Sequence, residues 1–117
     1  DFLAGVWENS FMKMDPHNVL AMISTGQDAD ISANPLYNGD FDKALNSIKA
    51  HACIMPGSTD LFCTAEENEY EARHIATAVL NPIDSIWGHF SGRGINSADN
   101  QFIDENLKRL LALNAKG

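Results

Sequence analysis

A chain of 117 residues is long enough for one modest domain, which would bury roughly two thirds of the surface that its unfolded form exposes. Hydrophobic residues make up 44% and charged residues 21% of the chain, a composition that favours a packed core and argues against disorder. The formal net charge is −8 and the 8 basic side chains are scattered, which argues against binding to nucleic acid or to an anionic membrane.

Chain-wide features limit the class of protein further. No apolar run approaches the roughly 20 residues that a membrane span needs, and the start at Asp1 lacks the basic residues of a signal peptide. Because the chain does not begin with Met, we expect it to come from inside a longer protein or from processing. Cys53 and Cys63 form neither a disulfide framework nor a C-x₂-C spacing, so no metal site is expected and a cytoplasmic location is favoured.

The first 14 residues have the spacing of a helix with a single apolar face. Asp15 then suits an N-cap and Pro16 the first helical position, where the N–H that proline lacks would have no partner. A second helix is therefore predicted from about Pro16. Its inward side is expected to carry Val19, Leu20 and Ile23.

Residues 25–39 are rich in turn formers and are predicted to be mostly irregular. Asp40 is the expected N-cap of a third helix, which ends near Ala50. One face of that helix is predicted from the apolar repeat Phe41, Ala44, Leu45 and Ile48.

Two short apolar runs predict two strands. Residues 52–55 are read as a strand buried on both faces, with Cys53 as a small buried thiol. Residues 78–83 are read as the second strand, in which Pro82 indicates an edge position or the strand's end. Between them, a capping box at Thr64 predicts a helix over about 65–74.

Asp99 is expected to cap a last helix. Its apolar face is predicted to carry Phe102, Ile103, Leu107, Leu110 and Leu111. The alternation of helices and strands is that of an α/β fold, and the crossover makes the two strands parallel. Two strands cannot form a sheet covered on both faces, so the chain either pairs with strands of another segment or subunit or is part of a larger fold.

An aspartate and a histidine follow the two predicted strands. Asp60 ends the segment MPGSTD and His89 ends the segment SIWGH. Because ligands bind outside the carboxyl ends of parallel strands, we expect these two side chains to lie near each other. An aspartate beside a histidine fixes the tautomer of the ring and stabilises its protonated form. From spacing alone, purely structural roles for both residues stay open.

Similarity to a known family is carried by residues 54–62 (IMPGSTDLF) and 82–89 (PIDSIWGH). The acidic helix at 66–71 and the segments 18–22 and 30–35 add to it, so that most of the chain is covered. In order and spacing these segments resemble the C-terminal part of α/β-hydrolase-fold proteins of the homoserine O-acetyltransferase-like family. The resemblance implies an α/β fold that keeps the last two parallel strands with their flanking helices.

The resemblance also implies a domain division and residue roles. Residues 1–38 would be the end of a helical lid, and residues 39–117 the C-terminal part of the hydrolase core. Asp60 would be the acid and His89 the general base of a Ser-Asp-His triad. The side chains expected to contact substrate are those of Trp87, Leu61 and Phe62.

The nucleophile of this implied triad is not in the chain, which has no G-x-S-x-G elbow. In the family the serine lies upstream together with the oxyanion hole. Cys63, Ser85 and Ser91 lie near the predicted strand ends, but none sits on such an elbow, so a supporting role is favoured for them. The chain alone is therefore not expected to be active.

The resemblance implies acyl transfer through an acyl-serine intermediate, with acetyl-CoA or another acyl-CoA as co-substrate and no bound cofactor or metal. The expected partners are an upstream segment that carries the serine, from the same precursor or a second chain, and a small-molecule acyl donor and acceptor. A second copy of the chain is a further candidate partner. Two alternatives stay open: an ester hydrolase of the same fold, and a non-catalytic binding module that keeps the scaffold.

Overall fold

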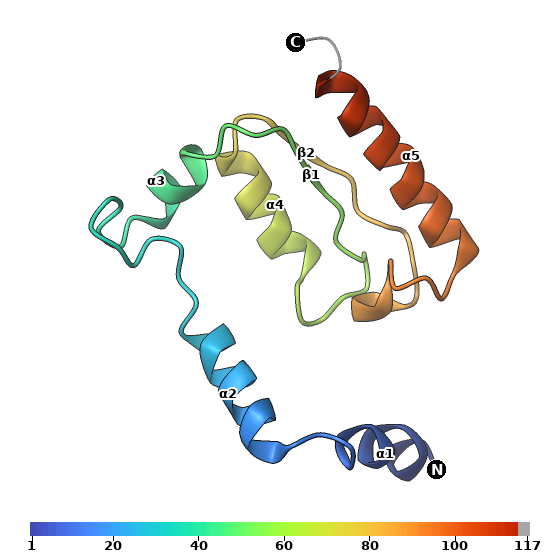
Figure 1. The fold of residues 1–117 in the computed structure, drawn as a ribbon. Helices are drawn as coiled ribbons and strands as arrows, with labels where there is room; N and C mark the ends of the chain where they lie inside the picture. The colour runs from blue at the N-terminus through green and yellow to red at the C-terminus, as the bar shows by residue number, and fades with distance from the viewer. Residues whose placement is uncertain (115–117) are drawn as a thin grey trace.

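A computed structural model describes residues 1–114 of the chain. In chain order its elements are η1 Leu3–Glu8, a π-helix, α1 Asn9–Phe11, α2 Pro16–Gln27, α3 Phe41–Asn46, β1 Ala52–Ile54, α4 Ala65–His74, β2 Ala78–Leu80, η2 Gly88–Phe90, a 3₁₀ helix, and α5 Ser97–Asn114. Figure 1 shows β1 and β2 between α4 and α5, with α1 and α2 extending away from this unit. No helix in the described part of the chain is long and apolar enough to cross a membrane.

The two strands pair in parallel, as the sequence predicts. Ala52 lies opposite Ala78 and Ile54 opposite Leu80, and a further bridge joins Gly57 to Ile83. The helix α4 forms the crossover between the strands. The strand β1 is half-buried along its length rather than buried on both faces, because the described residues form only a two-stranded sheet.

The two outer edges of this small sheet differ. Asn81 donates its N–H to the carbonyl of Ile54 and Ile83 donates to Pro56, both at 2.8 Å. Pro82 between them therefore faces the outer edge of β2, where its missing N–H costs no ladder bond. On β1 the backbone of Cys53 faces the other outer edge by the alternation of a parallel ladder, and it keeps its N–H. A further strand can thus add to β1 more readily than to the end of β2.

Side-chain caps set the helix starts that the sequence predicts. The Asp15 carboxylate accepts the N–H groups of residues 17 and 18, and Asp40 accepts that of Lys43. At the start of α4, the Thr64 hydroxyl accepts the Glu67 N–H while the Glu67 carboxylate accepts the Thr64 N–H, each at 3.2 Å. These contacts are local in sequence, so capping patterns alone are enough to place them.

Two predicted helix boundaries are wrong. The helix α3 ends at Asn46 instead of near Ala50. The stretch 25–39 is mostly irregular as predicted, since α2 ends at Gln27 and the next helix begins at Phe41. Asp99 does not cap α5, which begins two residues earlier at Ser97. The carboxamide of Asn96 accepts the N–H of residue 98 instead, at 3.0 Å, and the Asp99 carboxylate binds other side chains.

The buried apolar core is smaller than the composition suggests. Among the residues that the structure describes, it consists of Ala44, Leu45, Ile75 and Ile83. Leu20 is 65% and Ile23 52% exposed, so the expectation that they point inward is wrong: no described segment covers that face of α2. The radius of gyration is 17.4 Å, whereas a compact domain of this length has about 13 Å.

The predicted division into residues 1–38 and 39–117 stays a prediction, and residues 115–117 lie outside the described part. Figure 1 shows α2 joined to α3 by an extended connection. A local turn in this connection is fixed by Asp30, whose carboxylate accepts from both the N–H and the hydroxyl of the buried Ser32, at 2.8 and 2.6 Å.

Candidate active site

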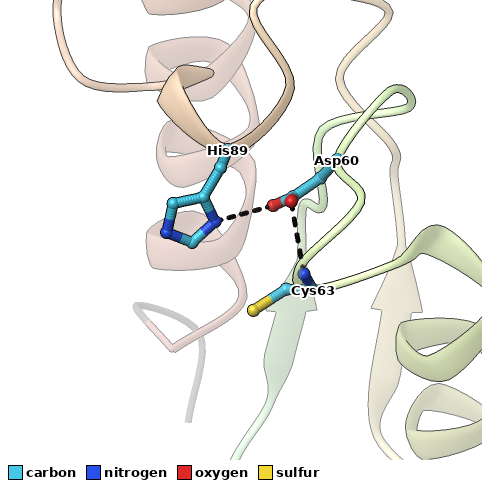
Figure 2. A group of neighbouring side chains, drawn as sticks. All are labelled: Asp60, Cys63 and His89. Atoms are coloured by element: carbon cyan, nitrogen blue, oxygen red, sulfur yellow. Dashed lines mark hydrogen bonds and ion pairs between the residues drawn. The ribbon is translucent and has the colours of Figure 1, made fainter. Parts of the chain in front are cut away.

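Asp60 lies in the loop after β1, with its carboxylate held on both oxygens. Oδ1 accepts the backbone N–H of Phe62 at 2.8 Å and that of Cys63 at 3.2 Å. Oδ2 lies 3.0 Å from Nδ1 of His89, as Figure 2 shows. The Phe62 N–H, together with His89 and the Cys63 N–H, lowers the pKa of Asp60, although desolvation opposes the shift. The carboxylate is therefore held in its charged form.

His89 lies in η2, after β2, and its ring is held from several sides. Because the ionised Asp60 can only accept, Nδ1 of the neutral ring carries the proton and Nε2 keeps a free lone pair. The ring meets Phe62 edge-on, with centroids 5.2 Å apart, and Phe90 at 6.5 Å. Its side chain is 45% exposed, and the contact with Asp60 is made by Nδ1, not by Nε2.

The two strand-end loops are joined by backbone and hydroxyl contacts beside this pair. The Thr59 hydroxyl donates to the carbonyl of Ser85 at 2.7 Å and accepts the N–H of Gly88 at 3.1 Å. At Gly57 an added Cβ would come within 2.6 Å of the Gly88 carbonyl oxygen, so only glycine permits this approach. Thr59 thus fixes the loop that carries His89 to the loop that carries Asp60.

A buried hydrogen-bonded pair, Ser85 and Asp99, supports the loop that carries His89. The Ser85 hydroxyl donates to Oδ2 of Asp99 at 2.8 Å and accepts the Trp87 N–H at 3.2 Å. Both Ser85 and Asp99 are buried. Sequence reasoning assigned Asp99 to a helix cap and did not single out Thr59. The residue types at both positions are ordinary, and only the tertiary contacts reveal these roles.

An open hollow of about 670 Å³ adjoins the Asp60 and His89 pair. Its other lining residues are Trp7, Thr59, Leu61, Phe62, Trp87 and Phe90. The three side chains predicted to contact substrate are all among them. Their role toward a substrate stays a prediction.

The three hydroxyl and thiol candidates within the chain, Cys63, Ser85 and Ser91, lie in different surroundings. Desolvation and the charges of Asp60, Glu67 and Glu71 raise the pKa of the Cys63 thiol, which works against the reactive thiolate. The Ser85 hydroxyl is engaged by Asp99. The Ser91 hydroxyl is buried. The supporting roles of these residues stay predictions.

The structure also brings together three side chains of types that bind metals, although they were not grouped from the sequence. One ligand atom each of Asp60, Cys63 and His89 lie within 4.8 Å of one another. The spacing of the two cysteines gives no sign of this cluster, because its members come from two loops that only the parallel pairing of the strands brings side by side.

A parallel strand pair with an aspartate and a histidine at its carboxyl end is the arrangement found in α/β hydrolases, and the chain is similar to enzymes of that class. No family model matches the chain. An ethyl acetate hydrolase from Pseudomonas veronii is 36% identical over 111 residues, which are 95% of this chain and 31% of that protein. A protein named as a probable esterase from Corynebacterium glutamicum is 32% identical over 92% of this chain and 30% of its own length.

A solved structure, that of the acetyl esterase MekB, matches with a TM-score of 0.86 and 34% identity. The match covers 95% of this chain and 32% of MekB, so the chain spans about a third of the length of the relatives it matches. Together, the strand topology and these relatives fit part of an α/β-hydrolase-type esterase. The finer resemblance to homoserine O-acetyltransferases is not supported, because the matched proteins are named as esterases.

Proposed function

We propose that this chain supplies the acid and the base of a serine esterase that hydrolyses esters of short acyl groups. The observation that carries the proposal is the 3.0 Å contact between Asp60 Oδ2 and His89 Nδ1, which leaves Nε2 outside this contact, on a half-exposed side chain that lines an apolar hollow. The names of the relatives, an ethyl acetate hydrolase and an acetyl esterase, support the substrate class. The nucleophile and the oxyanion hole come from a further segment of the same fold.

In this mechanism His89 Nε2 takes the proton of a serine hydroxyl as the serine oxygen attacks the ester carbonyl carbon. Asp60 stabilises the protonated ring and holds its orientation. The proton then passes from Nε2 to the departing alkoxide, which leaves as the alcohol and yields an acyl-serine. His89 next takes a proton from water, whose oxygen attacks the acyl carbon, and returns it to the serine as the acid departs.

Hydrolysis and acyl transfer differ only in the group that accepts the acyl chain. The relatives support water as that acceptor, while acyl-CoA as donor and the cytoplasmic location stay predictions. The test uses the whole protein that carries these residues, first with p-nitrophenyl acetate and then with acetyl-CoA plus homoserine. We expect acetate release from the ester, an acetyl group on a serine outside residues 1–117 after quenching, and no O-acetylhomoserine. Acetylhomoserine formation, or no acyl-enzyme with either donor, would refute the proposal.

Thr59→Val is expected to lower kcat for ester hydrolysis by on the order of 10-fold to 100-fold with little change in KM, because valine keeps the shape but loses both contacts that position the His89 loop. Thr77→Val is the matched control. Its hydroxyl also donates to a backbone carbonyl, that of Ala50 at 2.6 Å, but at the opposite end of the strands. Equal losses in the two variants would show that Thr59 acts on stability alone.

A further inference from the structure

Side chains of three different ligand types converge in the loops that follow β1 and β2. A carboxylate oxygen of Asp60, the sulfur of Cys63 and a ring nitrogen of His89 all lie within 4.8 Å of one another, as seen in Figure 2. Thiolate, imidazole and carboxylate are the three ligand types that Zn²⁺ uses in proteins. We propose that Asp60, Cys63 and His89 form a binding site for a thiophilic divalent cation, with Zn²⁺ as the expected ion.

The local structure prepares two of the three ligands. The N–H groups of Phe62 and Cys63 both bind Oδ1 of Asp60, and this turn brings the Cys63 side chain back beside the carboxylate. Oδ2 is left facing His89. Zn²⁺ requires ligand atoms at about 2.0–2.3 Å from the ion. The three atoms already lie within 4.8 Å of one another, and the side chains of Cys63 and His89, which are both exposed, would have to turn toward the ion.

Charge and coordination number also suit such a cation. A carboxylate and a thiolate together balance the two positive charges, and binding would release the thiol proton. Glu67 and Glu71 line a cleft together with Cys63, and the negative charges of the two glutamates favour a cation there. Three protein ligands leave a fourth position for water, as in open zinc sites. The sulfur ligand selects against Mg²⁺ and Ca²⁺, which prefer oxygen.

Occupation of the site would switch off the proposed esterase, and this consequence rests on the proposed function. In Figure 2 the Nδ1 atom of His89 faces Asp60. A cation at Nδ1 would replace the proton that Asp60 accepts, and a cation at Nε2 would occupy the lone pair that takes the serine proton. With either nitrogen bound, His89 no longer acts as a general base.

The binding test uses Co²⁺ as a spectroscopic substitute for Zn²⁺, added to the whole protein. We expect a thiolate-to-Co²⁺ charge-transfer band that saturates at one equivalent and disappears when Zn²⁺ is added. Cys63→Ser should lose the band and weaken Zn²⁺ binding by more than the roughly 10-fold to 100-fold that loss of an outer-shell contact costs. Cys53→Ser, at the other cysteine and within β1, is the matched control and should keep the band.

A band that persists in Cys63→Ser, a band that is lost in Cys53→Ser, or no band in the wild type would overturn the site. Circular dichroism of both variants establishes that they fold alike. The activity test is separate: Zn²⁺ should inhibit the wild type, and the ratio of rates with and without Zn²⁺ should move toward one in Cys63→Ser. A band without inhibition overturns the switch, whereas an inactive wild type overturns the proposed function and leaves the Co²⁺ result to decide the site.

Discussion

Replacing His89 with alanine is expected to lower kcat for ester hydrolysis by on the order of 10⁶-fold, the scale seen when the base of a triad is removed. His89 is the group whose Nε2 has access to the hollow while its Nδ1 is held by Asp60. Alanine removes both the proton acceptor and the later proton donor, so serine attack and departure of the alcohol both fail. Steady-state rates on p-nitrophenyl acetate measure the loss.

His74→Ala is the control for this variant. His74 ends α4, where its Nδ1 lies 2.8 Å from the Tyr70 carbonyl oxygen, and it is not among the residues that line the hollow. We expect the His74 variant to keep the wild-type rate. A His89→Ala protein that is folded by circular dichroism and still turns over at the wild-type rate would show that another group is the base.

The parts of the fold that the sequence predicts well are those that depend on near neighbours. The capping box at Thr64 and the Asp15 and Asp40 caps are made within a few residues, so residue type and spacing determine them. The parallel pairing follows from the crossover rule. Once the strands are parallel, their carboxyl ends lie side by side, which is why the contact between Asp60 and His89 could be predicted as well.

The parts that the sequence does not predict depend on distant neighbours. Thr59 and Asp99 are ordinary residue types, and their contacts with Ser85 exist only because two loops meet. Leu20 has the spacing of an inward-facing residue, but whether such a face is covered depends on chain segments that periodicity does not describe. The cluster of Asp60, Cys63 and His89 was not predicted for the same reason. Rules based on ligand spacing detect only ligands that are close in sequence.

Asp60→Asn is expected to lower kcat by on the order of 10⁴-fold while the fold is kept, because the carboxamide changes the tautomer of His89. Its oxygen can still accept the N–H groups of Phe62 and Cys63, which places its NH₂ group against Nδ1. An NH₂ group donates, so Nδ1 must accept and the ring proton moves to Nε2, where the base is needed. Asp104→Asn, an exposed residue of α5, is the control and should keep the wild-type rate.

The same variant has a second readout in its stability at low pH. The folded pKa of Asp60 lies below its ordinary value of about 3.9, so its charge contributes fully to the free energy of unfolding above that value. The contribution is lost as the pH falls through the lower, folded pKa. The difference in unfolding free energy between wild type and Asp60→Asn, measured by denaturant titration, should therefore shift against the wild type as the pH falls through this acid range. A difference that is independent of pH would show that the contacts of Phe62, Cys63 and His89 with Asp60 do not favour its charged form.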